Sequence, residues 1–159
     1  MTGIGPGRRR WLGGLPVLLV AIAMAPARAA TFAVNDNGTI VMPSLLAMRW
    51  RQQIPGRTAD HTIEGSLRVA LQLDLAAWVN RQVRLYMVMP PSAEAPVLAT
   101  WTTQGRLLSG SARSGSRTLV YSGQVTAPLL RESLQLQLAA DGRNVRGQLA
   151  VQFSFEVET

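Results

Sequence analysis

The side chains suited to catalysis are few, and the single histidine is the first to consider. His61 lies in the run Asp60-His61-Thr62-Ile63-Glu64, where a neighbouring carboxylate would orient an imidazole for general-base chemistry. A hydrolase would also need a nucleophile close to this imidazole, and no nucleophile-elbow motif marks one. The alternative is a solvated histidine at a strand edge, and the pattern favours it.

The composition excludes most other site chemistry. The chain has no cysteine and one histidine, which excludes disulfides, thiolate zinc sites, cysteine nucleophiles and multi-histidine metal sites. It contains no phosphate-binding glycine loop, calcium loop or dinucleotide fingerprint. Asp74, Glu132, Glu156 and Glu158 fall on predicted polar strand faces or strand starts, and Asp141 belongs to a turn. We therefore expect a non-catalytic protein with no cofactor and no metal site.

The first 29 residues have the pattern of a cleaved secretory signal peptide. Arg8-Arg9-Arg10 is a basic start, the run 11–24 is apolar, and Ala27-Arg28-Ala29 predicts cleavage before Ala30. The apolar run is shorter than the ~20 residues that a membrane-spanning helix needs. An uncleaved anchor is the alternative, and the paired arginines also fit twin-arginine export. We expect export through the inner membrane to the periplasm and then the cell surface, with no membrane span after cleavage.

Cleavage changes what the charge implies. The whole chain carries a formal net charge of +7 from 16 arginines and 9 acidic residues, a balance that would suggest nucleic acid. Without Arg8, Arg9, Arg10 and Arg28, 12 arginines face the 9 acidic residues and the net charge is +3. The remaining arginines are scattered, with no basic run or aromatic-interleaved stripe. We expect no nucleic-acid partner.

The rest of the chain alternates apolar and polar residues at period two, which predicts half-buried strands. The clearest stretches are 66–75, 82–89, 97–102, 118–125, 133–138 and 148–158. In 118–125 the pattern places Leu119, Tyr121 and Val125 on the apolar face. Asp141-Gly142 predicts a hairpin between the last two strands. Six or seven strands in a domain of this length predict an all-β antiparallel sandwich, with a small closed barrel as the alternative.

Three tryptophans lie beyond the leader and offer platforms for sugars or partner proteins. Trp101 shares a face with Val97 and Ala99, which predicts a core position. Trp78 fits either the core or a loop edge. Trp50 lies between two arginines that could stack on its ring.

The N-terminal segment after the leader also alternates. Phe32, Val34, Ile40 and Met42 fall on one face, with Gly38 on the same face between them. Such a segment suits a first strand of its own sheet. It equally suits a strand that is donated to the exposed edge of a neighbouring molecule.

The chain resembles a chaperone–usher fimbrial subunit in four features. These are a leader, a mature region of about 130 residues, an alternating N-terminal segment with a glycine, and an amphipathic last strand. The resemblance implies an immunoglobulin-like sandwich that lacks its last strand. A periplasmic chaperone first fills the gap, and the N-terminal segment of the next subunit then replaces it by donor-strand exchange. The chain departs from the family in having no cysteine pair and no penultimate tyrosine.

The resemblance also assigns residues to the two sides of this exchange. The donor residues would be Phe32, Val34, Gly38, Ile40 and Met42. The acceptor groove and chaperone-pairing strand would contain Leu149, Val151, Phe153, Phe155 and Val157.

We therefore expect three parts: a signal peptide over 1–29, an N-terminal extension or first strand over 30–44, and a β-sandwich over 45–159. The expected function is a structural subunit of a fimbria. Its expected partners are like subunits, a chaperone and an usher, together with a glycan or protein on a host or other surface. The alternative is a self-contained periplasmic sandwich that binds a protein or glycan partner through its loops.

Overall fold

The computed structural model describes residues 29–44, 46–52, 60–92, 95–145 and 151–159, so the predicted leader lies almost wholly outside the described residues. The chain in these ranges is all-β, with one short 3₁₀ turn, η1. The elements are β1 (Thr31–Ala33), β2 (Ile40–Met42), β3 (Arg49–Trp50), β4 (Thr62–Asp74), η1 (Ala76–Trp78), β5 (Gln82–Val88), β6 (Val97–Thr103), β7 (Gly110–Arg113), β8 (Arg117–Gln124), β9 (Leu129–Asp141) and β10 (Ser154–Glu158).

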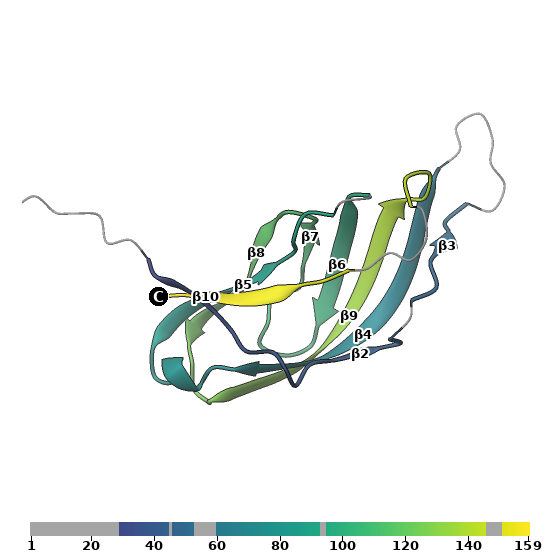
Figure 1. The fold of residues 1–159 in the computed structure, drawn as a ribbon. Helices are drawn as coiled ribbons and strands as arrows, with labels where there is room; N and C mark the ends of the chain where they lie inside the picture. The colour runs from purple at the N-terminus through teal and green to yellow at the C-terminus, as the bar shows by residue number, and fades with distance from the viewer. Residues whose placement is uncertain (1–28, 45, 53–59, 93–94, 146–150) are drawn as a thin grey trace, which may run out of the picture.

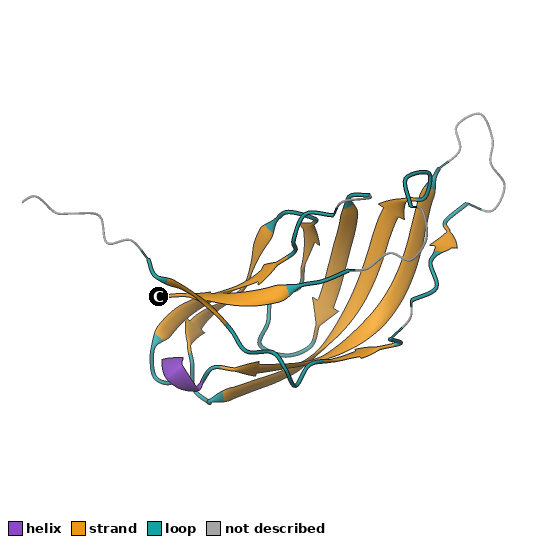
Figure 2. Cartoon of the chain, viewed as in Figure 1, coloured by secondary structure: helices purple, strands orange, loops and turns teal. Residues whose placement is uncertain are grey.

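Two antiparallel sheets pack as a sandwich, as the alternation predicts (Figures 1 and 2). The smaller sheet has the order β1-β10-β5-β8. The larger has the order β2-β4-β9-β6-β7, and β3 also pairs with β4. The longest ladder joins β4 to β9 from Thr62↔Asp141 to Asp74↔Leu129. No helix in the described residues is both long enough and apolar enough to cross a membrane.

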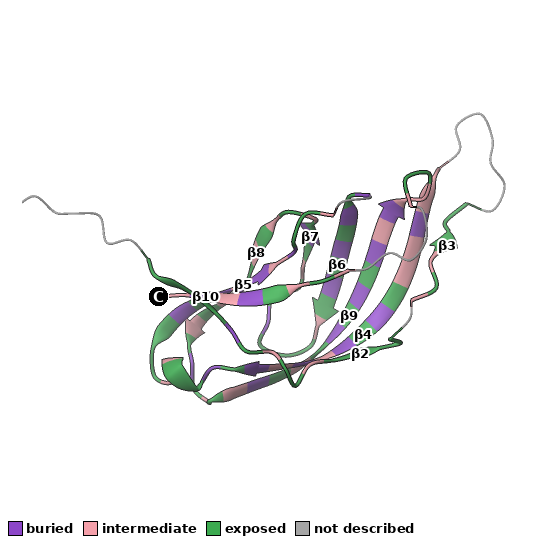
Figure 3. Cartoon of the chain, in the orientation of Figure 1, coloured by how far each residue is buried: buried purple, intermediate pink, exposed green. Residues whose placement is uncertain are grey.

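The core lies between the sheets and is built from alternate residues of the long strands, as the banding in Figure 3 shows. Val69, Leu73, Leu85, Val120, Leu134 and Val157 have no exposed surface. Trp101 is 1% exposed, which confirms the predicted core position, and its indole N–H donates to the carbonyl of Leu108 at 2.8 Å. The partner matters because a buried indole N–H without one would lose its hydrogen bond to water.

The predicted apolar face of β8 is wrong at Leu119 but correct for Tyr121, which packs against the core, and for the buried Val125 that follows the strand. The register between β5 and β8 shifts where Leu85 pairs with Tyr121 and the next residue, Tyr86, pairs with Leu119. Val120 is the extra residue of this β-bulge, and it is fully buried, whereas Leu119 is exposed on the outer face. A bulge inserts one residue and so reverses the face of everything beyond it.

The predicted hairpin at Asp141-Gly142 is also wrong. A turn does follow β9, where the amide of Asn144 donates to the carbonyl of Asp141 at 3.1 Å. However, β9 belongs to the larger sheet and β10 to the smaller one, so the chain crosses between sheets. The last two strands both present apolar residues to the core, and they do so from opposite sides.

The bulge predicts that Val120 contributes more to the free energy of unfolding than its larger neighbour Leu119. Val120→Ala should lower the free energy of unfolding by about 2 kcal/mol, because it removes two buried methyl groups and leaves a cavity. Leu119→Ala should cost less than about 1 kcal/mol, because that side chain is already exposed. Urea denaturation measures both, and a larger loss for Leu119→Ala would contradict the bulge.

Candidate functional site

The N-terminal segment, residues 31–42, crosses from one sheet to the other along one side of the sandwich (Figure 1). Its first strand, β1, pairs with β10 of the same chain from Thr31↔Glu158 to Ala33↔Glu156. The segment then changes sheets. The amide of Val34 donates to the carbonyl of Phe155 at 2.9 Å, whereas Asn35 bridges to Asp74 at the end of β4. The same segment therefore covers one edge of each sheet.

The apolar residues of this segment are largely left in water. Phe32, Ile40 and Met42 are 47%, 59% and 50% exposed, and only Val34 is buried, at 8%. Phe32 contacts the ring of Trp78 at a centroid distance of 6.1 Å and gains partial cover from it. The segment is thus held by short ladders and one buried side chain.

A tight turn separates the two short strands of the segment. The amide of Thr39 donates to the carbonyl of Asp36 at 2.8 Å, which closes a four-residue turn containing Gly38. A Cβ added at Gly38 would meet the end of the Gln72 side chain, so a larger residue there would require that side chain to shift. Thr39 fixes this approach, because its hydroxyl accepts from the amide of Gln72 at 3.1 Å.

The predicted acceptor strand is partly in the core. Phe155 and Val157 are 1% and 0% exposed, whereas Val151 and Phe153 are half-buried and precede the paired part of β10. Leu149 lies outside the described residues. A groove of about 520 Å³ runs between residues 151–154 and the N-terminal segment, and Val41, Leu67 and Val88 contribute to its lining.

Side-chain ion pairs attach β10 to its own sheet. Arg117 on β8 binds Glu156 at 3.0 Å and Glu158 at 3.1 Å, and Arg84 on β5 also binds Glu158 at 3.1 Å. The guanidinium of Arg117 lies 3.5 Å from the ring centroid of Tyr86. Partial burial lowers the pKa of Arg117, but its hydrogen bonds to Glu158 and Glu156 raise it above the ordinary value. This network ties β10 to β5 and β8 and leaves β1 outside it.

His61 lies at the far end of the larger sheet, beside the turn after β9. Its carbonyl accepts from the amide of Gly142 at 2.8 Å. Among the described residues no side chain is hydrogen-bonded to its imidazole, and no group of three or more metal-ligating side chains occurs. Asp141 binds Arg143 instead, and hydrogen bonds from the Arg143 side chain and amide lower the pKa of Asp141 to about 2.

Sequence reasoning placed Glu132 on a polar strand face or at a strand start, whereas it lies on the inward face of β9 opposite the buried Leu71. Its carboxylate accepts from the hydroxyl of Thr103 at 2.8 Å and from the amide of Arg106. The alternation did indicate this face, because residue 132 lies two and four positions before Leu134 and Leu136 and so shares their side of the strand. The strand simply begins earlier than the predicted residue 133.

Comparison with known proteins adds no assignment. No protein-family model, curated protein or solved structure matches this chain.

The N-terminal segment should be released by a change at its one buried side chain. Val34→Ser should weaken its attachment by about 2 kcal/mol, because it removes buried apolar surface and buries a hydroxyl. The amides of Asp74 and Thr159, which donate to Asn35 and Ala30, should then exchange roughly 30-fold faster. Ile40→Ser is the control and should change these rates less than about threefold, since Ile40 is already exposed. Equal effects of both variants, measured by hydrogen exchange, would contradict this attachment.

The Asp141–Arg143 pair predicts a pH effect. Because the folded state lowers the pKa of Asp141 to about 2, the pair stabilises the fold above the unfolded value near 3.9. This stabilisation is lost as the pH falls from about 4 through 2. Arg143→Gln should raise the Asp141 midpoint toward its ordinary value, as measured by carboxyl-carbon NMR. The stability difference between variant and wild type should be constant above pH ~5 and shrink on acidification; a difference that grows would contradict the assignment.

Proposed function

We propose that this chain is an exported structural subunit that assembles by exchanging its N-terminal segment between copies. One observation carries the proposal. Residues 31–42 cover an edge of each sheet through strands of three residues, while Phe32, Ile40 and Met42 stay about half exposed. A segment with this attachment can leave its own domain at small cost.

Exchange between identical copies conserves the ladder hydrogen bonds, because the arriving segment takes the registers of the departing one. A β10 edge without a partner would expose a row of hydrogen-bonding groups, which favours refilling. An arriving segment in these registers also restores the lining of the groove beside Val151 and Phe153, to which Val41 contributes. The ion pairs of Arg117 keep β10 in its own domain as the acceptor.

Under this proposal the donor residues are Phe32, Val34, Gly38, Ile40 and Met42, and the acceptor strand comprises Leu149, Val151, Phe153, Phe155 and Val157. An open-ended, head-to-tail contact of this kind builds a filament. The proposal includes the fimbrial features implied by the sequence resemblance: secretion through a cleaved leader, a periplasmic chaperone that holds the acceptor edge, and an usher that exports the subunits to the cell surface.

A second candidate is favoured by the pairing of β1 within its own chain. In that case the sandwich is self-contained and acts as a monomer whose surface binds a partner. The two candidates differ in one measurable property, namely which copy supplies the strand beside β10.

Cysteine trapping identifies that copy. The pair Val34/Phe155 is hydrogen-bonded, so the neighbouring pair Ala33/Glu156 is the closer, non-hydrogen-bonded kind, at about 4.5 Å between Cα atoms. This separation suits a disulfide, and the chain has no cysteine of its own to interfere. Ala33→Cys and Glu156→Cys chains, mixed at high concentration and oxidised, should give a covalent dimer of the two variants on a non-reducing gel. The double variant should give a ladder.

The control mixes Ala33→Cys with Ser122→Cys, which lies on β8 away from this edge and should give only collisional background. Exchange would be contradicted if the test mixture gave covalent dimer only at that background level and the double variant formed its disulfide within one chain. That result would favour the second candidate, a self-contained monomer whose surface binds a partner.

A further inference from the structure

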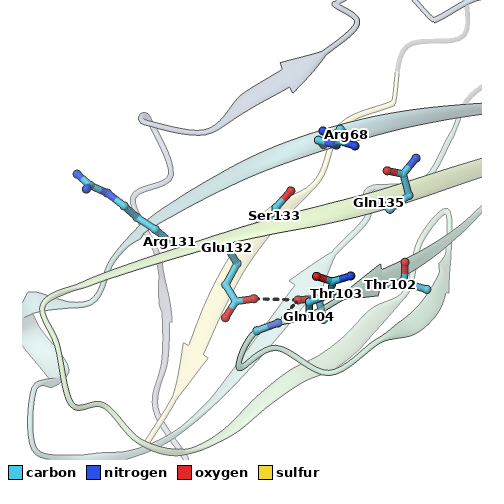
Figure 4. Close-up of a pocket in the computed structure, with 9 residues that line it drawn as sticks. Arg68, Thr102, Thr103, Gln104, Arg131, Glu132, Ser133 and Gln135 are labelled. Atoms are coloured by element: carbon cyan, nitrogen blue, oxygen red, sulfur yellow. Dashed lines mark hydrogen bonds between the residues drawn. The ribbon is translucent and has the colours of Figure 1, made fainter.

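A polar notch of about 570 Å³ lies on the larger sheet, remote from the β10 edge. It forms where β6 ends at Thr103, while β9 continues to Leu129 with β4 as its remaining neighbour. Figure 4 shows Arg68 and Gln135 on neighbouring strands, and Ser133 and Glu132 leaving β9 on opposite sides. We call this region the arginine notch and define it by Arg68, Thr102, Arg131, Glu132, Ser133 and Gln135.

The outward side chains form two rows across the strands. In the first row Arg68 pairs with Gln135, which pairs with Thr102 on its other side. In the second row Arg131 pairs with Gln72, and the Nε of Arg131 donates to the Gln72 amide oxygen at 3.2 Å. The rows are four residues apart along β9, on the order of 13 Å.

Small residues form the floor between the rows. Ala70 and Ser133 are register partners at this point, so a ligand can approach the sheet between two guanidinium groups. The surrounding amides and hydroxyls both donate and accept hydrogen bonds, which is the pattern that sugar hydroxyls require. Each guanidinium is a donor-only fork that matches a carboxylate.

The charge of the notch is positive. Within the described ranges the six ion pairs use Arg51, Arg84, Arg117 and Arg143, so neither Arg68 nor Arg131 takes part in one. Glu132 is the one carboxylate in the lining, and its two oxygens accept from Thr103 and Arg106.

Glu132 also argues against a peptide ligand. An extended peptide would add to the β9 edge beyond the end of β6. At that point the Glu132 carboxylate fills the space and binds residues 103–106, and a Cβ added at Gly105 would clash with it. The ligand must therefore be recognised by side chains on the sheet face and not by backbone pairing.

We propose that the arginine notch binds an acidic saccharide, with Arg68 and Arg131 binding carboxylate groups and Gln135, Ser133 and Thr102 binding hydroxyls. The exchanging segment borders this site, because β2 pairs Met42 with Arg68 and Ile40 with Ala70. An arriving segment that takes the same registers restores these neighbours. It would operate equally in an assembled subunit and in a monomer.

Calorimetric titration of the purified protein tests the site with trigalacturonic acid and sialyllactose as probes, galactotriose as the neutral control and hexaglutamate as the acidic peptide. At least one acidic saccharide should bind saturably, and more weakly as salt rises. Arg68→Gln/Arg131→Gln should weaken that binding at least tenfold. Arg113→Gln, an exposed arginine on β7 outside the notch, should change it less than twofold.

Several outcomes would overturn the proposal. One is the absence of saturable binding of either acidic saccharide. Another is binding of galactotriose or hexaglutamate with the same affinity as the acidic saccharide. The last is an affinity for the acidic saccharide that is the same in the double variant as in the wild type. The circular dichroism spectrum and thermal midpoint of each variant establish that it is folded, so that a loss of binding reports on the notch itself.

Discussion

The structure depends on the ladder between β4 and β9, which pairs residue for residue from Thr62↔Asp141 to Asp74↔Leu129. Leucine and valine occupy most of its inward positions, and this surface must be covered by a second layer because a single sheet cannot bury it. The smaller sheet provides the cover through Leu85, Phe155 and Val157. The hydrophobic effect on this one face thus requires the sandwich.

The same ladder explains where the candidate sites lie, because it is longer than its neighbours. On the β6 side the partner stops at Thr103, which leaves the notch that Glu132 and the arginines occupy. On the other side the short strands β2 and β3 cover parts of the β4 edge. One of them belongs to the N-terminal segment, so edge protection in the larger sheet and strand exchange in the smaller one involve the same residues.

The sequence predicted those strands in which the period of two runs without interruption. Leu67, Val69, Leu71 and Leu73 all lie in the core, as does Trp101. The prediction for β8 failed only at Leu119, because one inserted residue, Val120, reverses the alternation there and no local signal marks a bulge. The hairpin prediction failed because a turn sequence specifies the local reversal of the chain and not the sheet that the next strand joins. Glu132 was misplaced only because β9 begins earlier than its polar start suggested.

Taken alone, the sequence determined the strand-rich class, the residues able to form the core, the exclusion of thiol chemistry and the alternation of the N-terminal segment. These are local properties, set by residue type and by the geometry of an extended chain. Only the tertiary structure decided which edges the segment covers, how exposed Phe32, Ile40 and Met42 remain, and which residues the arginines pair with across strands. Those features depend on pairings between residues far apart in the chain, such as Arg68 with Gln135, and a one-dimensional pattern does not contain them.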